Sequence, residues 1–366
     1  MRRLLVTGAA GFIGSNFVQY WLEAHRDDHV VALDVLTYAG NLSSLDPVLK
    51  NSKLKFVKMD ILEGERVRAL MEREQIDTIV HFAAESHVDR SIHGPDPFLE
   101  TNIRGTHELL KAAKTVWLTG GGSGPYQFHH ISTDEVFGTL AADAPAFTEE
   151  TSYAPNSPYA ATKAASDHLV RAYHHTYGLP VTTSNCSNNY GPYQFPEKLI
   201  PLAIVRALEG KPIPVYGDGL QSRDWLYVRD HCRGIDRILE KGRVGETYNL
   251  GGGAERKNID VIKMLCSKFN AMFQSDAGLR SRFPRCPAAD GGDTASLITF
   301  VRDRPGHDRR YAVDAMKATL ETGYGPAESF ETGLGKTIVW YIANEPWWRS
   351  VMDGSYKEWM KQHYSG

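Results

Sequence analysis

The segment Leu4-Leu5-Val6-Thr7-Gly8-Ala9-Ala10-Gly11-Phe12-Ile13-Gly14 decides the fold of this chain. A short apolar run leads into a glycine-rich turn, and a helical pattern follows with Phe17, Trp21 and Ala24 on one face. Strand, glycine turn and helix in this order predict a dinucleotide site, because glycines allow a tight turn and a close approach of the backbone to a pyrophosphate. The N–H groups at the helix N-terminus would then face the phosphates.

An acid ends the second apolar run. Asp34 lies about 20 residues after Gly14, where a carboxylate can bind a ribose diol and repel a 2′-phosphate, so NAD is favoured over NADP. Asp60 and Ile61, at the end of the third run, are expected beside the adenine. An ordinary strand–turn–helix is the alternative, and the strand, helix and acid in register argue against it.

Further short apolar runs alternate with helical patterns up to residue 190, at 56–57, 78–80, 128–131 and 181–183. This alternation predicts an α/β protein with a Rossmann-type, doubly wound parallel sheet covered by helices on both faces. After Gly191 prolines become frequent. We therefore expect an NAD-binding domain at 1–190, with a return strand near 245–252, and a smaller C-terminal α/β substrate domain at 191–366. The Gly-, Asp-, Ser- and Pro-rich stretch 271–295 predicts a surface loop.

Composition limits the classes of partner and location. The 366 residues carry a formal net charge of -3, which gives no reason to expect nucleic acid or an anionic membrane as a partner. Four scattered cysteines without CxxC spacing favour a reducing, cytoplasmic setting. No apolar run approaches the roughly 18 residues of a membrane span.

A tyrosine and a lysine lie four residues apart at the start of a helix that begins near Ser157. Tyr159 and Lys163 therefore project from one face. An ammonium beside a phenol stabilises the phenolate and lowers the phenol pKa from about 10. Such pairs are also common on helix surfaces, and the dinucleotide turn upstream is what favours catalysis: the phenolate could take a proton from a hydroxyl while a hydride leaves for the nicotinamide.

Thr133, Asp134 and Glu135 close the run at 128–131. The carboxyl ends of parallel strands face the ligand crevice, so these side chains are expected opposite Tyr159. Two adjacent carboxyls beside a hydroxyl exceed what hydride transfer alone requires. A solvated acidic turn is the alternative reading.

The TGxxGxxG turn, the YxxxK pair and the acid after the second strand together resemble the extended short-chain dehydrogenase/reductase family. Four segments, 81–91, 133–135, 185–201 and 303–310, resemble the branch of nucleotide-sugar 4,6-dehydratases that act on dTDP-glucose. The likeness covers nearly the whole chain and weakens at 117–126 and 271–295. UDP-sugar 4-epimerases and decarboxylases share the scaffold; in that family epimerases lack both acids, and decarboxylases tend to carry Ser or Thr at the position of Asp134. A non-catalytic NAD-binding protein would lack Tyr159, Lys163 or the acids.

The resemblance implies the roles of the catalytic residues. Tyr159, assisted by Lys163, would remove the proton of the sugar C4 hydroxyl, and Thr133 would hydrogen-bond the C4 oxygen. Glu135 would remove the C5 proton, and a protonated Asp134 would donate to the C6 hydroxyl as water leaves. The hydride returns to C6, so a tightly bound, recycled NAD is expected.

The resemblance also implies two sets of binding residues. The NAD set is Gly8, Gly11, Phe12, Ile13, Gly14, Asp34, Thr37, Asp60, Ile61, Ala83, Tyr159 and Lys163. The nucleotide-sugar set is Ser86, Thr133, Asn188, Glu197, Lys198, Leu199, Pro214, Tyr216, Arg223, Asn258, Arg304 and His307.

Two further expectations concern metals and assembly. No metal is expected, because His81, Glu85, His87 and Asp89 have the chemistry of ligands without the spacing of a known metal motif. A homodimer is expected from the family, through helices near 102–116 and 158–177 that would form a four-helix bundle. Their apolar stripes alone are explained equally well by core packing.

Overall fold

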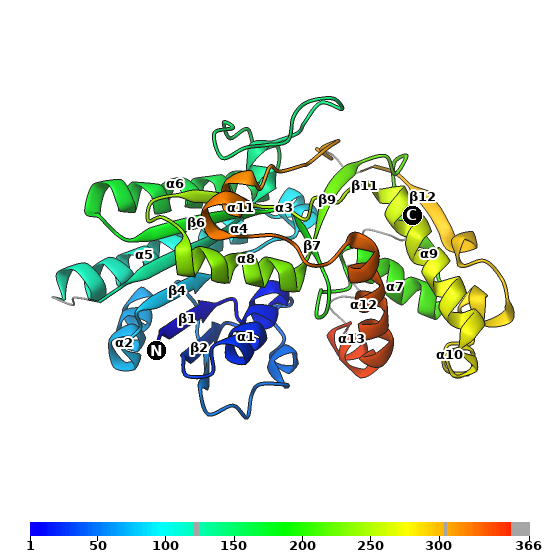
Figure 1. Cartoon of the computed structure of the whole chain (residues 1–366), viewed down its shortest axis with the longest axis horizontal. Helices are drawn as coiled ribbons and strands as arrows, with labels where there is room; N and C mark the ends of the chain where they lie inside the picture. Colours follow the sequence, from blue (N-terminus) through cyan, green and yellow to red (C-terminus); the bar gives the residue numbers. More distant parts are fainter. Residues whose placement is uncertain (121–123, 304–305, 353–366) are drawn as a thin grey trace.

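The strand that precedes the glycine turn lies inside a seven-stranded sheet in which every neighbouring pair is parallel (Figure 1). The computed structural model describes residues 1–120, 124–303 and 306–352. The strand order is β10-β6-β5-β4-β1-β2-β3. The strands are β1 (Arg3–Thr7), β2 (His29–Asp34), β3 (Leu54–Lys58), β4 (Thr78–His81), β5 (Gln127–Thr133), β6 (Val181–Cys186) and β10 (Thr247–Leu250). This order is that of a Rossmann sheet and confirms the predicted fold class.

Helices cover both faces of the sheet, which is why its strands are apolar on both sides. Leu4 and Val6 of β1 pack into the cluster that contains α1 (Phe12–Ala24) and α8 (Val228–Lys241). Leu5 faces the other way, into the cluster with α2 (Gly64–Glu74), α5 (Thr106–Ala113) and α6 (Pro158–Tyr177). The helix α5 lies within a continuous helical run over 96–119, which includes α4 (Asp96–Phe98).

A smaller part lies beside the sheet and is built mostly from the second half of the chain (Figure 1). Its strands form a three-stranded sheet, β11-β9-β7, and a parallel pair, β12-β8. These strands are β7 (Asn188–Tyr190), β8 (Ile213–Tyr216), β9 (Ser222–Tyr227), β11 (Glu255–Lys257) and β12 (Ile298–Val301). Its helices are α7 (Leu199–Glu209), α9 (Asn258–Ser275), α10 (Ala277–Arg282), α12 (Phe330–Ala343) and α13 (Glu345–Val351).

The chain returns to the large sheet for longer than one strand. The helix α8 packs on α1, β10 extends the sheet beside β6, and α11 (Met316–Thr322) packs on α8 and β10. From the sequence, only the strand of this return was expected, near 245–252.

The prediction of a surface loop at 271–295 is wrong. The helix α9 continues to Ser275, α10 follows at once, and two short helical turns span Pro287–Asp290 and Thr294–Leu297. The polar residues that indicated a loop are caps: Asp276 accepts hydrogen bonds from the backbone at the start of α10, and Asp293 does the same for the last turn. Phe283 between them is buried in the core.

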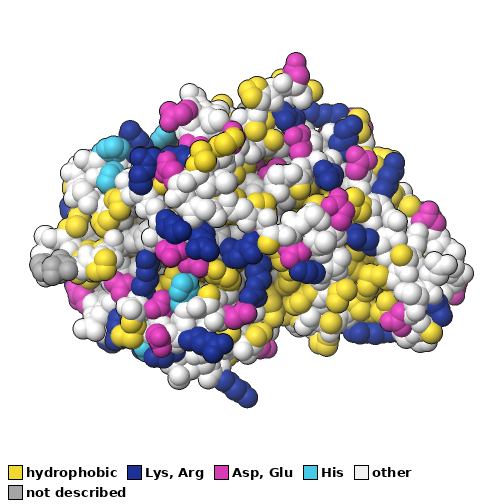
Figure 2. Space-filling view, in the orientation of Figure 1, with side chains coloured by type: hydrophobic (Ala, Val, Ile, Leu, Met, Phe, Trp, Pro, Cys, Tyr) yellow, Lys and Arg dark blue, Asp and Glu magenta, His cyan; other side chains and the backbone are white. Residues whose placement is uncertain are grey.

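Acidic and basic side chains are interspersed over the face shown in Figure 2, as the small net charge suggests. Within the described residues, no helix is both long enough and apolar enough to cross a membrane.

Candidate active site

A cavity of about 370 Å³ opens at the carboxyl ends of the central strands. All 12 residues of the expected NAD set line it, as do all five residues expected to be catalytic. The structure thus brings together the glycine turn, Asp34 at the end of β2, the triplet after β5 and the Tyr159–Lys163 pair of α6. This is the crevice in which ligands bind to open parallel sheets.

The glycine turn is a cradle that a Cβ atom would fill. A Cβ on Gly14 would lie 2.1 Å from the carbonyl oxygen of Gly8, and one on Gly8 would lie 2.6 Å from the nitrogen of Ala83. Gly8 also has a φ of 66°, a left-handed conformation that favours glycine. The turn therefore lies flat against the strands and leads directly into the N-terminus of α1, as a dinucleotide pyrophosphate requires.

Asp34 binds this turn as well as facing the cavity. Its Oδ2 accepts a hydrogen bond from the N–H of Ala10 at 2.9 Å, and its Oδ1 accepts one from Leu36 at 2.7 Å. Burial raises the pKa of the carboxyl, and these backbone donors oppose the rise. The acid that favours NAD over NADP thus also fixes the shape of the turn, a role that the sequence did not reveal. Asp60 and Ile61 line the cavity just beyond the last residue of β3.

The expected catalytic side chains form a connected, largely buried group. The Thr133 hydroxyl donates to Oδ1 of Asp134 at 3.4 Å and accepts from the N–H of Glu135 at 3.3 Å. It also hydrogen-bonds the phenol of Tyr159. Asp134 is 1% exposed, and its Oδ2 has no hydrogen-bond partner among the described residues. Glu135 is only partly buried, so the two neighbouring acids lie in different surroundings.

Electrostatics separate the groups further. Burial raises the pKa of Asp134 well above its ordinary range, and the nearby carboxyl of Glu135 raises it more. Both effects favour the protonated form of Asp134. Cys186 lines the same cavity, and burial raises the pKa of its thiol to about 12, so it is no nucleophile.

The expectation that Lys163 lowers the pKa of Tyr159 is wrong for this structure. Burial raises the pKa of the phenol well above its ordinary value, and the Glu135 carboxyl adds to the rise. The Nζ of Lys163 instead donates to the carbonyl oxygen of Ile131 at 2.8 Å. The hydrogen bond with Thr133 lowers the phenol pKa, although it does not offset burial.

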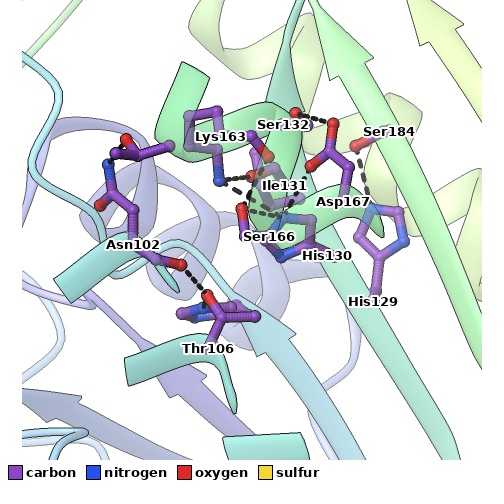
Figure 3. A network of polar contacts seen from close by, with 12 residues as sticks. Asn102, Thr106, His129, His130, Ile131, Ser132, Lys163, Ser166, Asp167 and Ser184 are labelled. Carbon is purple, nitrogen blue, oxygen red and sulfur yellow. Dashed lines mark hydrogen bonds and ion pairs between the residues drawn. The ribbon is translucent and has the colours of Figure 1, made fainter. Parts of the chain in front are cut away.

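A polar network lies behind the catalytic pair, inside the interface between α6 and β5 (Figure 3). Asp167 accepts from the Ser132 hydroxyl at 2.7 Å and lies 3.0 Å from Nε2 of His130. The same Nε2 lies 3.4 Å from Nζ of Lys163. His129 points to the other face of β5 and bonds Thr182 and Ser184. Consecutive residues of a strand point to opposite faces, so the two histidines cannot share one site.

The expected nucleotide-sugar residues divide into two groups. Five line the cavity: Ser86, Thr133, Asn188, Glu197 and Lys198. Six do not: Leu199, Pro214, Tyr216, Arg223, Asn258 and His307. Arg304 lies outside the described residues.

Most of the second group gathers at the β8–β9 side of the smaller part. The Tyr216 hydroxyl donates to Asp89, which follows β4, at 3.2 Å, and its ring lies 6.0 Å from that of His307. Arg223 is buried, stacks on the Tyr311 ring at 4.2 Å and donates to the carbonyl oxygen of Asp308 at 2.8 Å. The guanidinium of Arg223 therefore donates hydrogen bonds to the protein itself, which the sequence could not indicate.

Several cavity residues were not predicted, among them Gln194 and Phe195 of the loop between β7 and α7. Beside them the guanidinium of Arg90 lies 3.7 Å over the Tyr38 ring, and its Nε lies 3.6 Å from a Glu197 oxygen. Burial raises the pKa of Glu197 to about 7, with Lys198 and Arg90 opposing the rise. Arg90 and Phe195 lie in the segments 81–91 and 185–201, which carry the family resemblance. That resemblance could have indicated that these two residues belong to the site.

Metal-binding chemistry finds no support in the described part of the chain, where no three His, Cys, Asp or Glu side chains lie together as ligands would.

The sheet, the glycine cradle and the Tyr-Lys pair with its adjacent acids define a dinucleotide-binding protein of the extended short-chain dehydrogenase/reductase class. The chain belongs to the GDP-mannose 4,6 dehydratase family, whose family model it matches over residues 5–337. It is 54% identical over 360 residues to the dTDP-glucose 4,6-dehydratase of Xanthomonas campestris pv. campestris, with 98% of each chain covered.

Solved structures give the same picture. The dTDP-glucose 4,6-dehydratase from Streptomyces venezuelae with NAD and TYD bound is 46% identical, has a TM-score of 0.84, and the match covers 95% of this chain and 99% of that one. A UDP-glucuronic acid 4-epimerase from Bacillus cereus is 29% identical with a TM-score of 0.79, covering 93% of this chain and 99% of that one. The epimerase thus shares the scaffold at a clearly lower identity.

Proposed function

We propose that this chain converts dTDP-glucose to dTDP-4-keto-6-deoxyglucose with a bound NAD that is recycled in each turnover. The observation that carries the proposal is Asp134, a carboxyl that is 1% exposed and lies beside a second, more exposed carboxyl in the dinucleotide cavity; burial raises its pKa and so favours its protonated form. Hydride transfer alone requires no such proton donor, whereas removal of a hydroxyl as water does.

Oxidation at C4 begins the reaction. A bound NAD would supply the acceptor for the C4 hydride and its later return to C6. The phenolate form of Tyr159 takes the C4 hydroxyl proton and becomes the neutral phenol, and Thr133, which hydrogen-bonds Tyr159, orients the C4 oxygen. Because burial raises the pKa of Tyr159, the phenolate that acts as base requires a compensating positive charge, which Lys163 in the same cavity would supply.

Elimination uses the two acids in opposite protonation states. The C4 ketone acidifies the C5 hydrogen, which Glu135 removes as base. Asp134 donates its proton to the C6 hydroxyl, which leaves as water. The proton on Glu135 then returns to C5 as C6 receives the hydride. Two adjacent carboxyls can divide the work in this way only when their surroundings differ. Both line the cavity, but Asp134 is buried and Glu135 is only partly buried.

Substrate binding is proposed to span both parts of the chain. Lys198 is partly buried, donates to the carbonyl oxygen of Ser86 at 3.2 Å and lies at the start of α7. It is placed to meet the negative charge of a nucleoside diphosphate. On this proposal residues 1–190 hold NAD and most of residues 191–366 hold the dTDP group, with the β8–β9 side closing over it.

Epimerisation or decarboxylation of a UDP-sugar on the same scaffold is the alternative, and Asp134 would then have no role. The test is mass spectrometry of dTDP-glucose incubated in heavy water with the purified protein and no added NAD. A product lighter by one water, with deuterium at C5, supports both the reaction and the retained NAD. Unchanged dTDP-glucose, with UDP-glucose converted to an isomer of equal mass, would assign the chain to an epimerase.

We also propose a homodimer that pairs α5 and α6 with their copies. These helices pack together on one outer face of the sheet. Leu99 and Leu118, in the helical segments that flank α5, and Tyr177, at the end of α6, are 47%, 40% and 46% exposed. Sedimentation at micromolar concentration should give twice the 40.8 kDa chain mass. A single-chain mass would contradict the proposal. The cytoplasmic location expected from the cysteines stays a prediction.

A further inference from the structure

Helix α6 carries a third polar residue in line with the catalytic pair. Asp167 follows Lys163 by four residues, as Lys163 follows Tyr159, so the three share one face of the helix. That face lies on β5, where His130 and Ser132 point toward it (Figure 3).

Lys163 and Asp167 meet at a single ring nitrogen. Nζ of Lys163 lies 3.4 Å from Nε2 of His130, and Oδ1 of Asp167 lies 3.0 Å from the same atom. One imidazole nitrogen cannot donate to the carboxylate and accept from the ammonium at once. The Nδ1 of His130 has no hydrogen-bond partner among the described residues. Whether Nε2 carries the ring proton therefore determines whether His130 donates to Asp167 or accepts from Lys163.

We propose that Asp167 is the positioning residue of this site: its buried carboxylate holds the proton of His130 on Nε2 and is the counter-charge that keeps Lys163 protonated beside Tyr159 and NAD. This inference rests on the proposed function. The carboxylate suits the role because it is saturated with donors, accepting from the Ser132 hydroxyl at 2.7 Å and the Tyr153 hydroxyl at 3.0 Å as well as facing His130.

The charges agree with the geometry. Lys163 and Asp167 are 4% and 6% exposed, and a buried ammonium without a counter-charge tends to lose its proton. Burial lowers the pKa of Lys163, and Asp167 is the strongest influence raising it. Conversely, burial raises the pKa of Asp167 to about 6, and Lys163 is the strongest influence lowering it.

The other titratable groups around the pair are His81 on β4, His130 on β5, Cys186 on β6, and Tyr153, Tyr159 and His168. Burial keeps the imidazoles of His81 and His130 neutral by lowering their pKa, and it keeps the thiol and both phenols neutral by raising theirs. His168 is exposed beside Asp167 and adds positive charge only when protonated. Because these neighbours are neutral above neutral pH, the carboxylate of Asp167 is the group among them that supplies a negative charge to Lys163.

The expected effect of removing this charge is large. Two unit charges about 6 Å apart, at an effective dielectric constant of about 20, shift each other's pKa by roughly two units. Asp167→Asn keeps the shape of the side chain and removes the charge. We expect the alkaline limit of C4 oxidation to move to lower pH by at least about one unit, which is about a tenfold loss of rate on the alkaline side.

The experiment follows reduction of the bound nicotinamide by absorbance after mixing holoenzyme with dTDP-glucose across a pH series. The control is Tyr153→Phe, which removes a hydrogen bond to the same carboxylate and leaves the charge, so its alkaline limit should match the wild type. An alkaline limit unmoved in Asp167→Asn, or moved equally in both variants, overturns the inference.

A second measurement avoids the question of whether the variant folds. Nitrogen NMR of the wild-type histidine rings should find His130 neutral with its proton on Nε2 above pH about 6, the pKa of Asp167. A proton on Nδ1 throughout would also overturn the inference. If the wild type makes no dehydrated product, the proposed function fails; an active wild type with an unmoved limit refutes only the role of Asp167.

Discussion

Replacing Asp134 by Asn should separate the elimination of water from oxidation at C4. The side chain is 1% exposed, and Asn has nearly its volume, so the fold should tolerate the change. An amide cannot donate a proton to the C6 hydroxyl, and the loss of a positioned general acid costs about 10²–10⁴ in rate, or roughly 3–5 kcal/mol. Oxidation at C4 depends on Tyr159 and Thr133 and should change by only about threefold, less than 1 kcal/mol.

The assay mixes holoenzyme rapidly with dTDP-glucose. Reduced nicotinamide should form at nearly the wild-type rate in Asp134→Asn and then persist, while quenched samples analysed by mass show little loss of water. Glu135→Gln is the matched control: it should also halt elimination, but it should abolish deuterium exchange at C5, which Asp134→Asn retains. Equal losses of oxidation and elimination in Asp134→Asn would refute the assigned role.

Three further substitutions test the cavity. Gly14→Ala places a Cβ 2.1 Å from a backbone oxygen, so we expect purified protein without bound NAD, measured by ultraviolet absorbance of the released nucleotide; a normal NAD content would contradict the cradle. Asp34→Ala leaves two backbone donors without their acceptor, and calorimetry should show the protein destabilised by about 2–4 kcal/mol with less NAD retained, whereas unchanged unfolding would mean that these bonds are unimportant. Burial raises the pKa of Glu197 from 4.5 to about 7, so the folded protein keeps this proton where the unfolded chain has lost it, and stability falls as pH rises through this window. Glu197→Gln should therefore be more stable than wild type above pH 7, by about 3 kcal/mol at most, and equal to it near pH 4; thermal unfolding curves that differ equally at both pH values would exclude this cause.

The sequence predicted those features that depend on local geometry. Gly8 and Gly14 have roles that any dinucleotide turn imposes, and Asp34 has a position fixed by the length of one helix and one strand. Tyr159 and Lys163 share a face because a helix turns every 3.6 residues. Parallel strands all have their carboxyl ends at one edge of the sheet, which places Thr133, Asp134 and Glu135 at the same cavity as the glycine turn.

Features that depend on packing between distant segments were not predictable. Asp276 and Asp293 look like loop residues until the helices that they cap are seen. Arg223 has the chemistry of a phosphate-binding residue, yet in the fold its guanidinium donates to a backbone carbonyl and packs on an aromatic ring. The pKa of Tyr159 likewise depends on how dry its surroundings are, and spacing on a helix carries no information about that.

The division of labour between Asp134 and Glu135 follows from where β5 ends. A strand would send consecutive side chains to opposite faces of the sheet, but β5 stops at Thr133 and a helical turn, Asp134–Phe137, begins at once. Both acids line the cavity, but Asp134 is buried near the carboxyl of Asp224 and the guanidinium of Arg223, while Glu135 is more exposed. Burial raises the pKa of Asp134 above its ordinary value, and the two neighbouring carboxyls raise it more than Arg223 lowers it, which favours the protonated form that the proposed elimination requires. This change of backbone direction accounts for the different burial of the two acids on which their proposed roles as proton donor and base depend.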